Sequence, residues 1–219
     1  MSRSQKRDYK RDPSQSDHRK ANSHLQDRQE QTNQLERLRN LLSNQPATSS
    51  DGLEAVVGML INENRDSDLE ILLVQRAERT GDPWSGHIGL PGGRIKSTDS
   101  SPINACSREV MEEVGVDLSH EGELLGSLPP GFPWNRQELK VQPFIFKLHK
   151  RPTVHIGSEI LSAFWVALSE LPRMEGQSNV STRLGPRSVD SFLVDGRIVW
   201  GFTFRVLNEL LSLKQQSSR

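Results

Sequence analysis

The chain has 219 residues, of which 33% are hydrophobic and 26% charged, and its formal net charge at pH 7 is zero. This length suits one domain with a tail rather than two full domains. The balanced charge gives no overall attraction to nucleic acid or to an anionic membrane, and the single cysteine, Cys106, excludes an internal disulfide. We therefore expect no nucleic-acid or membrane partner.

The chain start and the cysteine content bear on the compartment. Residues 1–15 contain no apolar signal-peptide segment, and no apolar run is long enough to cross a bilayer. We expect a reducing, cytoplasmic environment. The Arg- and Ser-rich start also resembles a transit peptide, although acidic residues such as Asp8 interrupt it, so a mitochondrial or peroxisomal location stays open.

Residues 1–32 are polar and almost free of large apolar groups, which predicts a disordered tail. The acids among its basic residues, and the lack of aromatics, favour a solvated tail over an RNA-binding one. Residues 33–50 are predicted to form a short amphipathic helix and a linker, and the helix is expected to dock on the domain. The leucines at helical spacing are Leu35, Leu38, Leu41 and Leu42.

The domain itself is predicted to span residues 51–214, followed by a disordered end at 215–219. Apolar and β-branched runs predict strands, and an Asp-Gly pair predicts a turn within the last run. A Gly- and Pro-rich loop, residues 80–93, follows the second strand, and the domain closes with an amphipathic helix over residues 202–213. The predicted strand runs are residues 53–61, 69–76, 122–128, 139–148, 160–168 and 191–200.

A central helix is predicted over residues 101–115. Ser101 can cap it, Pro102 suits its first position and Gly115 suits a left-handed exit. An apolar stripe should face a sheet, which assigns Cys106 to packing rather than to nucleophilic catalysis. The residues of the stripe are Ile103, Cys106, Val110 and Val114. Strands interrupted by one central and one terminal helix predict an α/β (α+β) fold with a mixed β-sheet covered on both faces.

Three glutamates, Glu109, Glu112 and Glu113, share one face of this helix at spacings that make like charges repel. Arg108 can neutralise or orient Glu112, but one guanidinium cannot satisfy three carboxylates. The remaining charge suits a hard divalent cation, Mg²⁺ or its substitute Mn²⁺. The competing interpretation is a solvated acidic helix face.

A glycine pair, Gly92 and Gly93, lies just upstream of the glutamates. Paired glycines let a backbone approach a phosphate or offer a carbonyl oxygen to a metal, although they are also common turn residues. It is the presence of both features in one segment that favours a phosphate-handling metal site over a solvated helix face.

These residues resemble the signature box of the Nudix hydrolases, which cleave nucleoside diphosphates linked to another moiety. The second half of the box is intact as REVMEEVGV. In the first half, one extra residue precedes Arg108, and Asp99 stands where the family has a glutamate. The resemblance implies a Nudix-type α/β/α sandwich. The matching residues are Gly93, Arg108, Glu109, Glu112, Glu113 and Gly115.

The upstream pattern is similar to the branch of this family that hydrolyses coenzyme A, and the resemblance covers roughly residues 53–213. Leu72, Leu73 and Arg76 lead through a glycine loop to the Leu-Pro-Gly-Gly turn at residues 90–93. The branch's second loop arginine would fall near Asp82, and Arg79 is the nearest substitute. This resemblance implies cleavage of coenzyme A or acyl-CoA to 3′,5′-ADP and a 4′-phosphopantetheine.

The resemblance also implies roles for single residues. Glu109 and Glu113 are expected to ligate the metal with a Gly93 carbonyl, and Glu112 to bind a second ion or orient water. Arg108 is expected to hold the carboxylates, while the general base is either Glu112 or Glu159. The residues expected to bind substrate are Arg76, Arg79, Gly92, Gly93 and Arg94.

Further groups have two interpretations each. His87 either touches substrate or is a hydrogen-bonded loop histidine. The loop aromatics either stack on adenine or anchor their loops, and the arginines either meet a 3′-phosphate or are solvated. The aromatics are Trp84, Phe132 and Trp134, and the arginines are Arg76, Arg79, Arg183 and Arg187.

Three functions follow, in order of preference: a hydrolase of coenzyme A; a pyrophosphatase for ADP-ribose, NADH or a nucleoside triphosphate; and a Nudix-shaped binding module without catalysis. The expected partner is a small nucleoside diphosphate derivative, and a homodimer stays open.

Overall fold

The computed structural model describes residues 35–42, 51–64, 68–182 and 185–217. The predicted tail, the linker after the first helix and Arg183 lie outside these residues. The strands are β1 Ala55–Glu63, β2 Leu69–Arg76, β3 Ile88–Gly89, β4 Gly92–Arg94, β5 Gly122–Ser127, β6 Val141–Leu148, β7 Ile160–Ala167, β8 Glu175–Thr182, β9 Gly185–Val194 and β10 Arg197–Trp200. The helices are α2 Pro102–Val114, α3 Leu118–Glu121, the 3-10 helix η1 Leu171–Arg173 and α4 Gly201–Ser217, and residues 35–42 are also helical.

The larger sheet has seven strands in the order β3-β2-β1-β6-β5, with β4 paired to β1 and β7 paired to β2. β1 and β6 run parallel, and the other pairs are antiparallel. The start of β1 therefore lies between β4 on one edge and the start of β6 on the other. The predicted mixed sheet is therefore confirmed.

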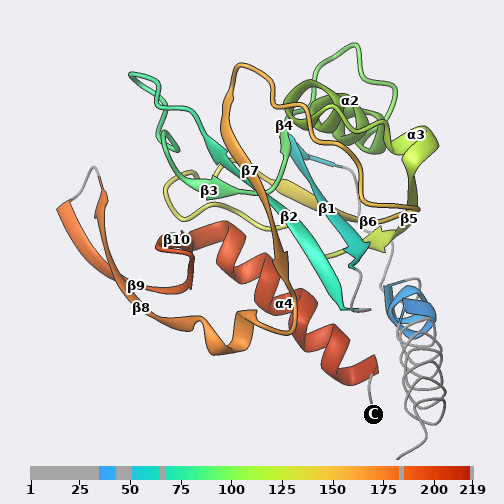
Figure 1. The fold of residues 1–219 in the computed structure, drawn as a ribbon. Coiled ribbons are helices and arrows are strands. Elements are labelled where there is room, and N and C mark those ends of the chain that lie inside the picture. The colour runs from blue at the N-terminus through green and yellow to red at the C-terminus, as the bar shows by residue number, and fades with distance from the viewer. Residues whose placement is uncertain (1–34, 43–50, 65–67, 183–184, 218–219) are drawn as a thin grey trace, which may run out of the picture.

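The two faces of this sheet are buried against different helices, because successive side chains of a strand point to opposite faces. Val56 and Leu60 of β1 share a core cluster with the apolar side of α2, whereas Met59 and Ile61 share one with α4. Figure 1 shows the sheet between α2 and α4. The predicted α/β/α sandwich is thus confirmed.

The helical segment 35–42 packs on the same side of the sheet as α4. Leu35, Leu38 and Leu42 are buried in the α4 cluster. Arg39 also forms an ion pair with Glu123 of β5. Docking of this amphipathic segment on the domain is therefore confirmed for the residues described.

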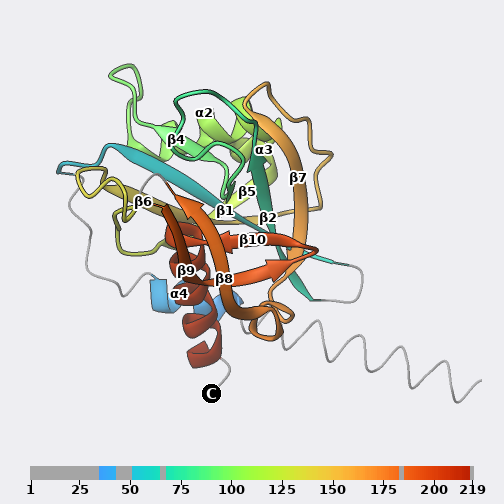
Figure 2. The same ribbon diagram turned by 90° about the vertical axis from the view of Figure 1, so that its left-hand side faces the viewer.

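The last three strands form a separate sheet in the order β10-β9-β8, which differs from the expected single sheet. The predicted turn joins β9 to β10, with Asp195 and Gly196 at φ 48° and 77°. β8 was not predicted, because its sequence EGQSNVST has no apolar alternation. Figure 2 shows this sheet beside α4, whose first residue directly follows β10. α4 continues to Ser217, beyond the predicted domain end.

Helix α2 has the predicted ends. The Ser101 side chain accepts a hydrogen bond from the Asn104 amide at 3.2 Å, and Gly115 has φ 68°. Cys106 is buried, but Ile103 is 38% exposed, so its place on the sheet-facing stripe was wrong. At 100° per residue, Ile103 points between Val110 and Val114, so its exposure reflects its place in the first turn of the helix rather than its direction.

None of the helices in the described residues is both long and apolar enough to span a membrane.

Candidate active site

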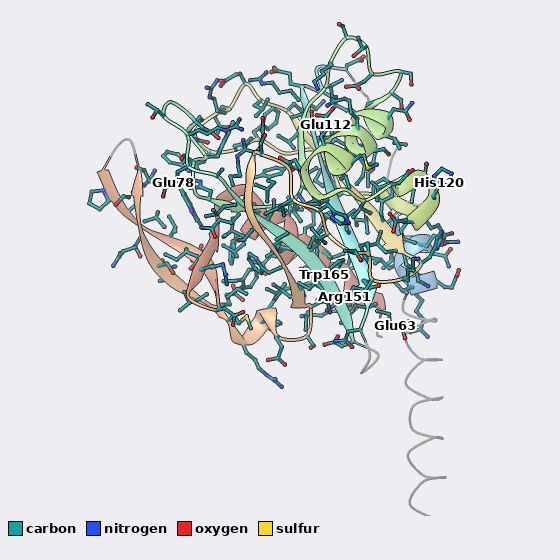
Figure 3. The ribbon with its side chains drawn as sticks, turned by 45° about the horizontal axis from the view of Figure 1, so that its top comes forward. Glu63, Glu78, Glu112, His120, Arg151 and Trp165 are labelled. Atoms are coloured by element: carbon teal, nitrogen blue, oxygen red, sulfur yellow. The ribbon has the colours of Figure 1, made fainter. Side chains whose placement is uncertain are left out.

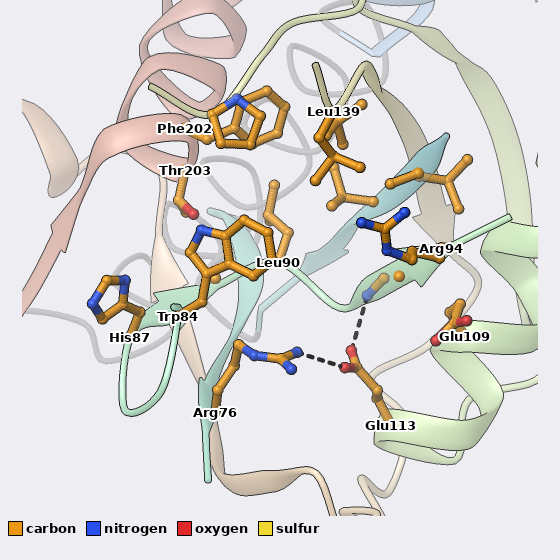
Figure 4. A pocket seen from close by; sticks show the side chains of 18 of the residues that line it. Arg76, Trp84, His87, Leu90, Arg94, Glu109, Glu113, Leu139, Phe202 and Thr203 are labelled. Atoms are coloured by element: carbon orange, nitrogen blue, oxygen red, sulfur yellow. Dashed lines mark hydrogen bonds and ion pairs between the residues drawn. The ribbon is translucent and has the colours of Figure 1, made fainter. Parts of the chain in front are cut away.

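A pocket of about 630 Å³ opens where α2, β4, the loop before β4, residues 133–139 and the start of α4 meet. Figure 4 shows Glu109 and Glu113 on its α2 side and Phe202 on its α4 side. Most predicted site residues line this pocket. They are Arg76, Gly92, Gly93, Arg94, Glu109, Glu112, Glu113 and Glu159, whereas Arg79 and Arg108 are outside the lining.

Glu113 is the most buried of the three glutamates, at 5% exposure. Its Oε2 accepts a hydrogen bond from the Gly92 amide at 2.8 Å, and its Oε1 lies 3.4 Å from Arg76 Nη1. Burial raises the pKa of Glu113 to about 7, and the Gly92 amide and Arg76 only partly oppose that effect. Because burial disfavours the charged form of Glu113, a bound cation would stabilise its carboxylate.

Glu109 lies against the backbone of Gly93. A Cβ atom at Gly93 would come within 2.5 Å of Glu109 Oε2, so a larger residue would push the carboxylate aside. Gly93 is held there because β4 pairs with β1, where it faces Val56. The predicted grouping of the glycine pair with the helix glutamates is therefore seen in space.

Arg108 holds the outer side of this carboxylate group. Its Nε and Nη2 donate to the two Asp99 carboxylate oxygens at 2.8 and 2.9 Å, and its Nη1 donates to Glu109 Oε1 at 2.6 Å. The same Nη1 lies 3.3 Å from Glu112 Oε2. The Arg108 side chain lowers the pKa of Asp99 to about 2. Asp99, where the family box has a glutamate, thus fixes Arg108.

Glu112 is the exposed member of the three. Its side chain is 52% exposed, and Lys96 Nζ lies 3.6 Å from Glu112 Oε2. Arg94 is also exposed, and its Nη1 lies 3.3 Å from Glu54 Oε2. Glu112 and Arg94 can therefore reorient toward a ligand, in contrast to Glu113.

The donor chemistry of this wall fits a hard divalent cation. Carboxylate and backbone oxygens are the preferred ligands of Mg²⁺, and the Gly93 backbone leaves space that a Cβ atom would fill against Glu109. In the described part of the chain, however, no three His, Cys, Asp or Glu side chains are already close enough to form a metal site. Ion binding would have to draw these carboxylates together.

The loop between β2 and β3 is fixed by ion pairs. Arg76 Nη2 lies 3.1 Å from Asp82 Oδ2 and 3.8 Å from Glu159 Oε2. Arg79 Nη1 lies 3.0 Å from Glu159 Oε1. Although burial alone would raise the pKa of Asp82, the Trp84 amide and Arg76 lower it. Asp82 stands near the position where the coenzyme A pattern has a second arginine. Here it binds Arg76, the first arginine of that pattern.

Four aromatic residues also line the pocket: Trp84, Trp134, Trp200 and Phe202. Phe132 is outside the lining and 38% exposed. His87 lines the pocket, with its ring 5.1 Å from that of Trp200, and burial lowers the pKa of His87.

Cys106 lies outside the pocket lining. Burial raises the pKa of its thiol to about 12, which confirms a packing role rather than a nucleophilic one.

Several pocket residues were not predicted, namely Asp82, Lys96, Trp200, Phe202 and Thr203. The sequence did point to Asp82, because this residue lies near the position of an arginine in the coenzyme A pattern. Lys96 lies in the stretch that is one residue longer than the family box. The start of α4 carried no local signal, because only the tertiary structure brings it to the pocket.

The family model described as NUDIX domain matches residues 52–184. A protein of Schizosaccharomyces pombe, "Uncharacterized protein C14C4.10c", is 38% identical over 116 residues, which cover 50% of this chain and 35% of that protein. "Peroxisomal coenzyme A diphosphatase ndx-8" of Caenorhabditis elegans is 29% identical over 131 residues, or 59% of this chain and 55% of that protein. The chain thus spans about half or less of the length of these two relatives.

Among solved structures, the NUDIX domain of Shewanella oneidensis NrtR, complexed with ADP ribose, aligns with 81% of this chain and 96% of that one. The sequence identity is 19% and the TM-score 0.48.

Proposed function

The chain belongs to the NUDIX domain family, and from that premise we propose that its pocket hydrolyses the pyrophosphate bond of a nucleoside diphosphate derivative with the help of Mg²⁺. The observation that carries the proposal is the convergence of Glu109, Glu113 and the Gly92–Gly93 backbone on one wall of the pocket. Mn²⁺ would substitute for Mg²⁺, because both prefer oxygen ligands.

Glu109, Glu113 and the Gly93 carbonyl would hold the ion, with Glu112 binding a second ion or orienting water. A divalent cation bound there neutralises phosphate charge and lowers the pKa of a bound water. Arg108 keeps Glu109 and Glu112 in place through its contact with Asp99 and does not touch the substrate.

In the reaction, a water oxygen bonds to one phosphorus and the bridging oxygen leaves with the other phosphate. Glu112 or Glu159 accepts the proton of the attacking water. Both carboxylates line the pocket and are about half exposed, so both can reach a bound water. Arg76 would turn from Glu113 toward a substrate phosphate once an ion compensates that carboxylate.

Coenzyme A or an acyl-CoA is the proposed substrate, with 3′,5′-ADP and a 4′-phosphopantetheine as products. Two findings support it: the Arg76-to-Gly93 pattern, and a relative named a coenzyme A diphosphatase. ADP-ribose, NADH and nucleoside triphosphates are the competing substrates, because Asp82 replaces an arginine of the coenzyme A pattern.

The test is a hydrolysis assay of the purified full chain with coenzyme A, ADP-ribose, NADH and ATP, each with Mg²⁺, Mn²⁺ or EDTA. We expect coenzyme A to turn over fastest and EDTA to abolish the activity. Glu109→Gln and Glu113→Gln should each lower kcat by about 100-fold or more, because the stabilising charge at the reacting phosphate is lost.

The matched control is Glu175→Gln, since Glu175 is exposed on β8 outside the pocket lining. It should retain full activity. Faster turnover of ADP-ribose or NADH than of coenzyme A would refute the substrate assignment. If none of the four compounds were hydrolysed, the proposed hydrolase activity would be refuted and a binding module would be favoured.

A further inference from the structure

The pocket has two chemically different sides, and this division gives a direction to the bound substrate. Figure 4 shows Trp84, Leu90 and Phe202 on one side, and Glu109 and Glu113 on the other. The acidic side suits a metal-bound diphosphate, whereas the aromatic side suits the flat face of another ring.

Tryptophan is concentrated at this pocket. The chain has four tryptophans, all within the described residues, and three of them line the pocket. The fourth, Trp165, lies on β7 outside the lining. Half-buried aromatic faces in a pocket are costly to leave in water and suit the flat face of another ring.

The aromatic side is also supported from behind. Trp84 and Phe202 pack against the buried cluster of Ala55, Leu139 and Val141. Because these rings come from the β2–β3 loop and from the start of α4, only the folded domain brings them together.

An arginine lies over each of three pocket rings. Arg136 Cζ is 5.9 Å from the Trp84 ring centre, and Arg187 Cζ is 4.7 Å from that of Trp134. Arg205 lies 5.7 Å from the Phe202 ring and also donates to the Phe132 carbonyl. Rings held in this way lose less conformational freedom when a ligand stacks on them.

We infer that Trp84, Trp134 and Phe202 form a nucleobase subsite, so that the substrate binds with its base against these rings and its diphosphate at Glu109 and Glu113. This inference rests on the proposed function, which supplies the nucleotide character of the substrate. A purine is the preferred base, because its fused rings cover more of an indole than a pyrimidine does.

The test is calorimetric titration of the full chain with ADP, UDP and inorganic pyrophosphate, each with Mg²⁺. We expect ADP to bind more tightly than UDP. Trp84→Ala and Trp134→Ala should each weaken ADP binding by about tenfold or more, the effect typical of a lost base–aromatic contact. Pyrophosphate, which has no base, should bind these variants as it binds the original chain. Trp84→Phe keeps a ring and should retain most of the ADP affinity.

Trp165→Ala is the matched control, because Arg151 lies 5.3 Å over the Trp165 ring just as arginines lie over the pocket rings. Figure 3 shows Trp165 beside Arg151 and away from Glu112. Thermal melts of all variants establish that they are folded at the assay temperature. The control should bind ADP and pyrophosphate normally.

Two results would overturn the subsite: ADP affinity equal in Trp84→Ala, Trp134→Ala and Trp165→Ala, or a parallel loss of ADP and pyrophosphate binding in the pocket variants. Failure of the proposed function is distinguishable from both. If no substrate is hydrolysed but ADP binding still depends on Trp84, the subsite stands and the hydrolase proposal fails.

Discussion

Helix α2 and the loop between β2 and β3 both supply pocket residues, but different forces hold them. α2 is fixed by its Ser101 cap, its Gly115 exit and the burial of its apolar side against one face of the larger sheet. The loop is fixed by the ion pairs of Arg76 and Arg79 with acids around it. The three glutamates proposed for metal binding and catalysis are therefore on the element that is held more firmly in the fold.

This difference has an energetic side. Burial of apolar side chains contributes about 1.5–3 kcal/mol each, whereas an exposed ion pair contributes about 0–1 kcal/mol. Changes on α2 should therefore affect catalysis or the stability of the fold. Changes in the loop should affect substrate binding and leave the fold intact. Three predictions test this division.

The largest effect concerns Glu113 in metal-free protein. The pKa of Glu113 is about 7 in the folded state, and its ordinary value is 4.5. Below about pH 4.5 the carboxyl is mostly neutral in both states, whereas above about pH 7 it is charged in both states and that charge is buried only in the folded state. The free energy of unfolding should fall as pH rises through this window, by about 3 kcal/mol at most from this group.

Chemical denaturation in EDTA from pH 4.5 to 8 measures this effect. Glu113→Gln has no titrating carboxyl and should show a smaller fall, while Glu175→Gln should follow the original chain. If the free energy of unfolding depended on pH in the same way in Glu113→Gln and in the original chain, the raised pKa of Glu113 would be contradicted.

Arg108→Ala should have the next largest effect. Its guanidinium holds Glu109 and Glu112 while bound to Asp99, and loss of a residue that orients metal ligands typically costs about 10- to 100-fold in activity or metal affinity. Steady-state kinetics and the Mg²⁺ dependence of turnover measure it. Arg173→Ala is the control, because Arg173 of η1 forms an exposed ion pair with Glu170 and lies outside the pocket lining. Equal activity of both variants would exclude the positioning role.

Asp82→Ala should have the smallest effect. It frees Arg76 from a half-buried ion pair and removes the acceptor of the Trp84 amide, so the loop should loosen by about 1 kcal/mol or less. We expect a higher KM with little change in kcat or in the melting temperature. If Asp82→Ala lowered kcat as strongly as Arg108→Ala, the division of labour between helix and loop would be wrong.

The outcome for single residues shows where sequence interpretation is strong and where it is weak. The ends of α2 were predicted because a cap and a glycine exit act within a few residues. Ile103 was misplaced because periodicity gives the direction of a side chain and not how far the neighbouring strands extend. β8 was missed because a polar and mostly exposed strand shows no apolar alternation.

By itself, the sequence determined the mixed sheet, the central helix and the spacing of its three glutamates, since these follow from local backbone preferences and from the periods of strand and helix. Tertiary structure alone decided that Glu113 is buried while Glu112 is exposed, that Asp99 binds Arg108, and that the start of α4 completes the pocket. Burial and long-range contacts depend on how distant segments pack, and no local pattern encodes that.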